Sequence, residues 1–291
     1  MKRGSKIKTV AIAGAGTMGS SLAQIFARYG YSVVLYLRRR EGIDKSQALI
    51  SINQRALIEQ GDLTPDESKA LLERIVWTTE TNDLCRSDFL VEAITEDMDA
   101  KRLFWNEASS LLPEDVVLTT NTSGLSITAM SESVRLPERF CGMHWINPPH
   151  IVPLVEVTGG ARTSEETLEI VSDVALSLGK HPVTVRGDPQ GFILNRLQFA
   201  LLREALSIVE KGHASIKDVD DVMKYGLGMR YACIGPFETV DLGGLDTFYR
   251  IASYLFADLN DEKKPSGLLS KLYHEGAYGT KAGRGFYDYS G

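Results

Sequence analysis

Residues 9–37 read TVAIAGAGTMGSSLAQIFARYGYSVVLYL, which places a glycine-rich turn between two short apolar segments. The first segment, Thr9 to Ala13, and the second, Ser32 to Leu37, are rich in β-branched residues and predict strands. Between them, apolar residues recur at helical spacing from Leu22 to Tyr29, and Gly30 ends the pattern. This order predicts a βαβ unit in which the two strands are parallel.

The turn has the spacing G-x-G-x-x-G, formed by Gly14, Gly16 and Gly19. At this spacing the first glycine permits a tight turn, the second lets the backbone approach a pyrophosphate, and the third lets the helix pack on the strand. The helix that follows would face the phosphates with its N-terminus, and Thr17 and Met18 within the turn would contact the cofactor. The turn therefore predicts a dinucleotide site of the Rossmann type, and glycines that serve only a tight turn are the alternative.

The end of the second strand, Tyr36-Leu37-Arg38-Arg39-Arg40, bears on the choice of dinucleotide. An acidic residue about 20 positions after the glycines normally binds the adenosine ribose, and none stands here. Because a guanidinium group binds a 2′-phosphate well, the arginines favour NADP(H) over NAD(H), with Arg38 as the contact. The alternative is a solvated run of arginines without a role in binding.

Alternating strand and helix patterns continue beyond this unit. A helix is predicted over Ser164–Leu178, and two helices interrupt the strand rhythm over residues 42–75. The second of these opens with Thr64, Pro65 and Glu67, the pattern of a capping box with a first-turn proline. Further strands are predicted at Phe89–Ala93, Val116–Thr119, Phe140–His144, Leu154–Val157 and His181–Val185. The whole is typical of an α/β domain with a parallel sheet.

The strand pattern disappears in the last third of the chain. Phe192 to Val209 repeats apolar residues at helical spacing, and Ser215 with Asp218 predicts the cap of another helix. We therefore expect a dinucleotide-binding Rossmann domain over residues 1–187 and an all-helical domain for substrate binding and dimerisation over 188–291.

The helical domain also predicts a homodimer. Its first helix offers more apolar surface than one small helical layer can cover. The residues concerned are Leu197, Leu201, Leu202, Ala205, Ile208 and Val209.

Composition limits the partners and the compartment. The net charge of -6 at pH 7 argues against nucleic acid or an anionic membrane as a bulk partner. The 3 cysteines lack Cys-x-x-Cys spacing, so neither a disulfide framework nor a cysteine-ligated metal is expected. The first apolar run is too short and too interrupted by glycine for a signal peptide or a membrane span. These features predict a cytoplasmic enzyme without a metal.

Short motifs extend from the glycine turn almost to the end of the chain. They are GAGTMG at 14–19, VEAITE at 91–96, NTS at 121–123, HWINPP at 144–149, GFILNR at 191–196 and GFY at 285–287. Together they resemble the L-3-hydroxyacyl-CoA dehydrogenase superfamily. The resemblance implies an NAD(P)-dependent oxidoreductase that acts on the CH–OH group of its donor.

The resemblance further implies a catalytic role for His144 as general base and for Glu156 as the acid that orients it. Ser123 and Asn195 would line the substrate side. A histidine can hold the proton released as hydride leaves, and a nearby carboxylate fixes its tautomer. Taken alone, His144 could be a structural histidine and Glu156 part of a solvated strand face.

By the same resemblance, Glu96, Lys101, Asn121 and Asn147 would surround the nicotinamide and its ribose. Each has an ordinary alternative. Lys101, for example, could be a solvated lysine on the helix that continues through Phe104.

The choice between a CoA thioester and a free acid depends on the two helices predicted over residues 42–75, the helical excursion from the strand pattern. Members of the superfamily that use CoA carry lysines where this chain has Glu59 and Asp62. Because carboxylates repel the phosphates of CoA, this departure puts an acyl-CoA substrate in doubt without excluding it.

Two other stretches, NPPHIVP at 147–153 and GLGMRY at 226–231, resemble members of the superfamily that act on free acids. Those members are L-gulonate 3-dehydrogenase, carnitine dehydrogenase and 5-formyl-3-hydroxy-2-methylpyridine-4-carboxylate 5-dehydrogenase. Arg230 would bind the substrate carboxylate through its planar guanidinium group, and His150 would line the same pocket. An arginine at a dimer surface is the alternative for Arg230.

The sequence therefore predicts an oxidoreductase that transfers hydride between a 3-hydroxy acid, or an equivalent carboxylate-bearing alcohol, and NADP or NAD. Oxidation of an L-3-hydroxyacyl-CoA such as 3-hydroxybutyryl-CoA is the alternative. A non-catalytic protein, comparable to the lens λ-crystallin that is related to L-gulonate dehydrogenase, is a more remote one.

Overall fold

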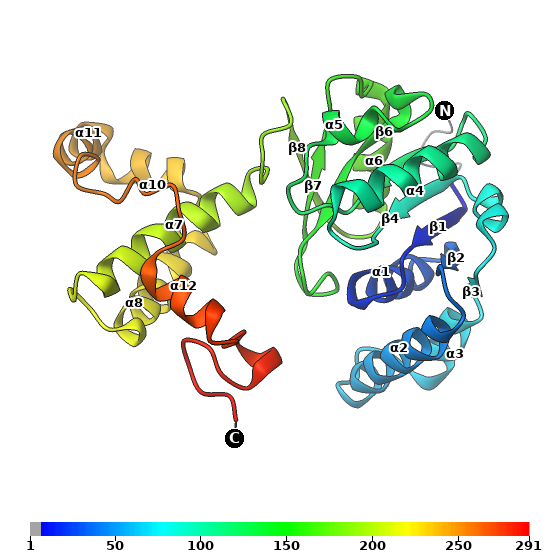
Figure 1. Ribbon diagram of the computed structural model, residues 1–291, viewed down its shortest axis with the longest axis horizontal. Helices are drawn as coiled ribbons and strands as arrows, with labels where there is room; N and C mark the ends of the chain where they lie inside the picture. The colour runs from blue at the N-terminus through cyan, green and yellow to red at the C-terminus, as the bar shows by residue number, and fades with distance from the viewer. Residues whose placement is uncertain (1–6, 291) are drawn as a thin grey trace. The chain divides into compact units, whose positions relative to one another are not determined.

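The computed structural model describes residues 7–290 and divides the chain into two compact units, Met1–Asn195 and Arg196–Gly291 (Figure 1). The first unit contains one large sheet with helices on both faces, and the second is built of helices. The prediction of a Rossmann-type sheet followed by a helical domain is therefore confirmed.

The sheet of the first unit has the strand order β3-β2-β1-β4-β5-β6-β7-β8. Its strands are β1 (Thr9–Ala13), β2 (Ser32–Tyr36), β3 (Ile75–Thr78), β4 (Phe89–Glu92), β5 (Val117–Thr120), β6 (Phe140–Trp145), β7 (Leu154–Thr158) and β8 (His181–Val185). Every neighbouring pair is parallel except β6 and β7. The carboxyl ends of β1, β4, β5 and β6 therefore meet at one edge, where α/β sheets bind their ligands.

Two features of this sheet differ from the prediction. β7 is antiparallel to β6, because the loop 146–153 is too short for the crossover that two parallel strands require. The edge strand β3 was not predicted, because its four residues directly follow a helical pattern and Val76 is exposed. The helical excursion accordingly ends at Leu72 rather than near residue 75.

The α-helices that lie wholly within the described part of the first unit are α1 (Thr17–Arg28), α2 (Glu41–Glu59), α3 (Pro65–Leu72), α4 (Met98–Leu111), α5 (Ile127–Ser131) and α6 (Glu165–Ser177). Apolar residues of α1 and α6 form one core with the sheet, in which Phe26 is fully buried. Residues of α4 and α5 form the other core around Trp105. The sheet thus lies between two helical layers. The capping box of Thr64 and Glu67 at the start of α3 is confirmed.

The second unit continues α7 (Leu194–Glu210) into a series of helices. These are α8 (Ile216–Val222), α9 (Gly228–Tyr231), α10 (Pro236–Gly243), α11 (Leu245–Leu255) and α12 (Gly267–His274), with a π-helical turn at Met223–Leu227. The predicted cap of Ser215 and Asp218 opens α8. Between residues 196 and 290 the only strand-like pairing consists of isolated bridges near the C-terminus, as the sequence pattern indicates.

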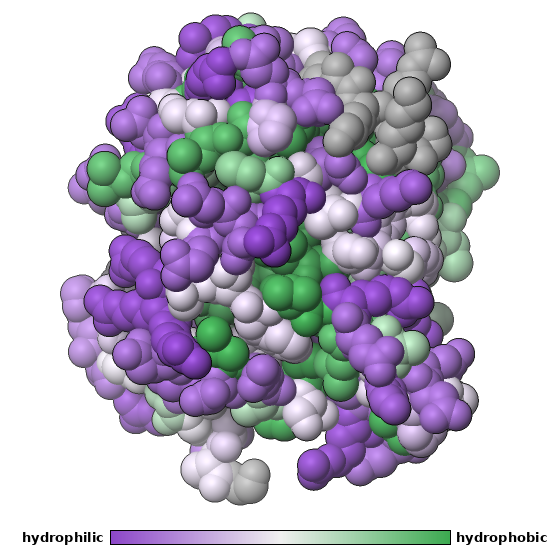
Figure 2. Space-filling model, turned by 90° about the vertical axis from the view of Figure 1, so that its right-hand side faces the viewer, coloured by the Kyte–Doolittle hydropathy of each residue, from purple (hydrophilic) through white to green (hydrophobic). Residues whose placement is uncertain are grey.

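Hydrophilic side chains cover most of the face that Figure 2 shows, and apolar side chains form a strip in its middle.

Several large apolar side chains of α7, α10 and α11 are exposed, among them Leu197, Phe199, Phe237 and Tyr249. No helix within the described part of the chain is long and apolar enough to cross a bilayer.

Candidate active site

The glycine turn between β1 and α1 fits a dinucleotide phosphate. A Cβ at Gly19 would lie 1.8 Å from the carbonyl oxygen of Gly14, and one at Gly14 would lie 2.5 Å from the carbonyl oxygen of Ala93, so only glycine permits this packing. A Cβ at Gly16 would meet no atom within 4 Å, which leaves room for a phosphate beside the exposed Thr17. The first turn of α1 has no acidic residue and no side-chain cap, so its amide groups are available to an anion.

The antiparallel pairing of β6 and β7 places His144 directly opposite Glu156. Nδ1 of His144 lies 2.8 Å from Oε2 of Glu156. The other carboxylate oxygen, Oε1, accepts hydrogen bonds of 2.9 Å from the backbone amides of Ile193 and Leu194, at the start of α7. Since both side chains are buried, the solvated alternative for Glu156 is wrong.

These contacts determine the charge of Glu156. Burial alone would raise the pKa of this carboxyl group, but the hydrogen bonds from His144, Leu194 and Ile193 outweigh it and lower the pKa below its usual value. Glu156 is therefore a carboxylate, and it accepts the proton of His144 Nδ1 in a hydrogen bond. The lone pair of Nε2 is then free to accept a proton. The imidazole ring packs edge-on against Phe192, with ring centroids 5.6 Å apart.

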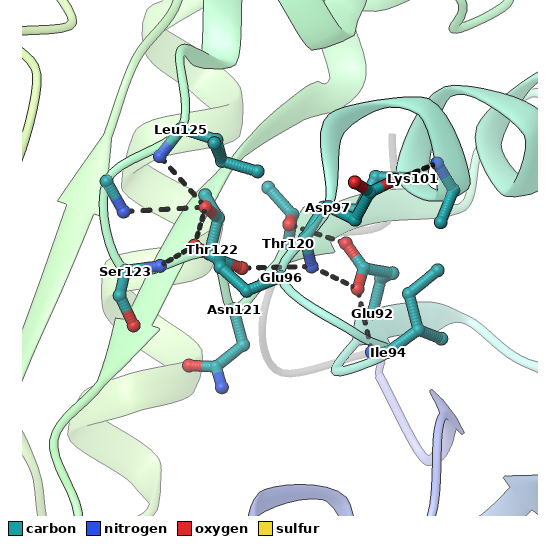
Figure 3. A network of polar contacts seen from close by, with 12 residues as sticks. Glu92, Ile94, Glu96, Asp97, Lys101, Thr120, Asn121, Thr122, Ser123 and Leu125 are labelled. Atoms are coloured by element: carbon teal, nitrogen blue, oxygen red, sulfur yellow. Dashed lines mark hydrogen bonds and ion pairs between the residues drawn. The ribbon is translucent and has the colours of Figure 1, made fainter. Parts of the chain in front are cut away.

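Ser123 lies at the end of β5 with its backbone held from two sides. Its amide donates a hydrogen bond of 2.8 Å to Oε1 of Glu96, and its carbonyl oxygen accepts one of 2.6 Å from Nδ2 of Asn195. The hydroxyl points away from Glu96 (Figure 3) and has no hydrogen-bond partner among residues 7–290. The turn thus presents a free hydroxyl on a fixed backbone.

The buried Lys101 and the exposed Glu96 belong to one polar network between β4, β5 and α4 (Figure 3). Nζ of Lys101 lies 2.6 Å from Oε1 of Glu92 and 3.4 Å from Oε2 of Glu96. The side chain of Lys101 is only 1% exposed, so the alternative of a solvated lysine is wrong. Glu92 was not among the residues predicted for the site; the feature that could have identified it is its position as an acidic residue at the end of an apolar strand.

The two asparagines differ in their surroundings. Oδ1 of Asn121 accepts a hydrogen bond of 2.9 Å from the backbone amide of Trp145, which ties the end of β5 to the residue after His144. Asn147 lies exposed in the loop that follows β6.

The three remaining candidate residues, His150, Arg38 and Arg230, are exposed. His150 lines a cavity of about 130 Å³ with residues of α1 and α2, among them Arg28 and Gln54. Arg38 is exposed just beyond β2, and Arg230 is exposed on α9 of the second unit. No group of His, Cys, Asp and Glu side chains within residues 7–290 is arranged to hold a metal ion.

Two family models match the chain over almost its whole length. Residues 9–188 match the NAD binding domain of 3-hydroxyacyl-CoA dehydrogenase, and residues 191–289 match the C-terminal domain.

Individual relatives match equally widely. The 5-formyl-3-hydroxy-2-methylpyridine 4-carboxylate 5-dehydrogenase of Mesorhizobium japonicum is 33% identical, over 98% of this chain and 91% of the relative. A probable 3-hydroxybutyryl-CoA dehydrogenase of Deinococcus radiodurans is 38% identical, over 96% and 99%. A crystal structure of a 5-formyl-3-hydroxy-2-methylpyridine 4-carboxylic acid 5-dehydrogenase, described as an NAD⁺-dependent dismutase, is 33% identical in sequence. It superposes with a TM-score of 0.89 over 97% of this chain and 91% of that one.

Proposed function

This chain belongs to the 3-hydroxyacyl-CoA dehydrogenase family of NAD-dependent enzymes that act on CH–OH groups, and we propose that it oxidises the hydroxyl of a 3-hydroxy acid or an equivalent carboxylate-bearing alcohol. The observation that carries this proposal is the buried His144–Glu156 pair, in which hydrogen bonds keep the acid ionised and leave Nε2 free.

In the proposed reaction, Nε2 of His144 takes the hydroxyl proton of the substrate. The carbon–hydrogen electron pair leaves as hydride, and a carbonyl group forms. A nicotinamide, when bound, supplies the hydride acceptor. The carboxylate of Glu156 stabilises the imidazolium that results, and the free hydroxyl of Ser123 can donate a hydrogen bond to the reacting oxygen.

A free acid is favoured over a CoA thioester by the charges on the helical excursion. Glu59, at the end of α2, and Asp62, in the turn after it, are both exposed, so neither carboxylate lies in a buried ion pair. The Mesorhizobium japonicum relative is named for a carboxylate substrate. The alternative, oxidation of 3-hydroxybutyryl-CoA, is favoured by the name of the Deinococcus radiodurans relative.

Substitutions of Arg230 test directly whether the enzyme binds a substrate carboxylate. If its guanidinium group binds the acid, replacing Arg230 with alanine should raise KM and lower kcat/KM by about 1.5 to 3 kcal/mol, as expected for a charge-assisted hydrogen bond. Replacing it with lysine should recover part of the loss, because an ammonium keeps the charge without the fork geometry. Steady-state kinetics with free 3-hydroxy acids measure both effects.

The matched control for this experiment is Arg250→Ala, since Arg250 is an exposed arginine on α11 of the same unit. It should leave kcat/KM unchanged. Faster turnover of 3-hydroxybutyryl-CoA than of every free acid tested would contradict the free-acid proposal and establish the thioester alternative.

We further propose that the enzyme prefers NADP(H) over NAD(H) through Arg38. The proposal is supported by the exposed run of arginines after β2, where an acid would otherwise bind the ribose. Arg38→Ala should lower kcat/KM for NADP by about 10- to 100-fold and leave that for NAD nearly unchanged. Arg55→Ala, on the exposed surface of α2, is the control. Better use of NAD than NADP by the wild-type enzyme would refute the preference.

We also propose a homodimer formed through the helical domain, in a reducing cytoplasm. The exposed apolar side chains of α7, including Leu197 and Leu201, support the dimer, and the free thiols of Cys85, Cys141 and Cys233 fit the compartment. Light scattering should give twice the chain mass of 32.1 kDa. A monomer at micromolar concentration would contradict the dimer.

A further inference from the structure

Glu92 closes β4 and is completely buried, yet the proposed reaction gives it no role. Its carboxylate accepts three hydrogen bonds from three different elements. Oε1 accepts from the backbone amide of Ile94 at 2.8 Å and from Nζ of Lys101 at 2.6 Å, and Oε2 accepts from Oγ1 of Thr120 at 2.6 Å. Glu92 therefore joins the loop after β4, helix α4 and the end of β5.

The contacts continue from Lys101 toward Ser123. Nζ of Lys101 lies 3.4 Å from Oε2 of Glu96. The other oxygen of Glu96 accepts hydrogen bonds of 2.6 Å from Oγ1 of Thr122 and 2.8 Å from the amide of Ser123. Glu92, Lys101 and Glu96 thus form a continuous polar chain that ends on the backbone of the candidate site (Figure 3).

The exposed fractions of Glu92, Lys101 and Glu96 indicate which of these residues holds which. The side chains of Lys101 and Glu92 are 1% and 0% exposed, whereas that of Glu96 is 44% exposed. An ammonium buried this deeply requires a close carboxylate partner, which only Glu92 provides at 2.6 Å. Oε1 of Glu96 is held by Thr122 and the Ser123 amide, and the ammonium of Lys101 is the charged group that lies beside Oε2. Glu92 therefore fixes the cation, and the cation fixes Glu96.

We propose that Glu92 is a positioning residue, which acts through Lys101 and Glu96 to hold the 121–123 turn in place before substrate or cofactor binds. The backbone then need not reorganise when the free hydroxyl of Ser123 meets the substrate. A catalytic group is most effective when it is held in place in this way. In this arrangement Lys101 supports the site from inside the protein.

The test is hydrogen–deuterium exchange of the Ser123 amide in ligand-free protein, because that amide donates to Glu96. Glu92→Gln keeps the shape and one carbonyl oxygen but removes the charge that holds Lys101. Exchange at Ser123 should become about 10- to 100-fold faster, and kcat should fall by about tenfold with KM for NAD changed less. Glu165→Gln, which removes an exposed carboxylate paired with Arg186, is the control and should change neither.

Two further variants separate positioning from other roles. Lys101→Met should also accelerate exchange at Ser123 in the absence of cofactor, whereas a lysine that only binds cofactor would leave this exchange unchanged and overturn the proposal. The double variant Glu92→Gln/Lys101→Met removes both buried charges, so its Tm should recover toward that of wild type while exchange at Ser123 stays fast.

Exchange that rises equally in the distant strands β2 and β3 would mean that Glu92 only stabilises the fold, and would also overturn the proposal. Failure of these exchange measurements leaves the proposed reaction intact, because that reaction depends on His144 and is tested separately.

Discussion

Replacing His144 with alanine is expected to lower kcat by about 10²- to 10⁴-fold, the usual contribution of a general base, while the Kd for NAD changes little. Only the imidazole Nε2 is free to take the proton of the substrate, since Nδ1 is bound to Glu156. Among residues 7–290, the side chain of His144 has its hydrogen bond with Glu156 and its ring contact with Phe192 rather than with the glycine turn, so cofactor affinity should be preserved. Steady-state kinetics and cofactor titration measure the two quantities.

His181→Ala provides the control, because His181 is exposed at the first position of β8. The His144 variant must also be shown to fold, since it removes one of three hydrogen bonds to buried Glu156. A loss of about 1 to 3 kcal/mol in unfolding free energy is expected. Near-normal turnover by a folded His144→Ala protein would refute its assignment as the general base.

The Glu156→Gln variant is expected to lose about 10- to 100-fold in kcat, less than the His144 variant, because Glu156 orients the imidazole and stabilises its charged form without taking the substrate proton. The amide keeps the size of the side chain but removes the negative charge beside Nδ1. The difference in stability between wild type and this variant should depend on pH in a manner that identifies the ionised carboxylate of Glu156.

The sign of that dependence follows from the lowered pKa of Glu156 in the folded protein. A carboxyl group that is more acidic when folded stabilises the protein above its unfolded pKa, near 4.5, and loses this contribution as pH falls through the folded pKa. Wild type should therefore exceed Glu156→Gln in unfolding free energy at pH 7, and the difference should shrink below pH 4.5. Urea denaturation at pH 7 and pH 3.5 measures it; a difference that is independent of pH would contradict an ionised Glu156.

Features that depend on neighbouring residues could be predicted from the sequence. The glycine turn and both capping boxes are local, because their donors and acceptors lie within a few positions of each other. Glu156 alternates with Val155 and Val157 along β7, so its side chain lies on the opposite face of the strand. Motif resemblance then placed it beside His144, which the antiparallel register accounts for.

Features that depend on long-range packing could not be predicted. The burial of Lys101 requires Glu92, which belongs to another element and lies in a strand that reads as apolar. The amides that bind Glu156 come from residues 193 and 194, far along the chain. His150 is close to His144 in sequence, yet it lines a cavity against α1 and α2, because the loop after β6 carries it there.

The hydrogen bonds from Ile193 and Leu194 to Glu156 have a consequence for protein engineering. The segment that leads out of the sheet thus holds the carboxylate of the His144–Glu156 pair, and Asn195 in the same segment donates a hydrogen bond to the carbonyl of Ser123. A truncation at residue 187 would therefore yield a domain whose buried carboxylate has lost two donors and whose histidine is poorly oriented. Chimeras that exchange helical domains between relatives should keep residues 188–195 with the parent that supplies the sheet.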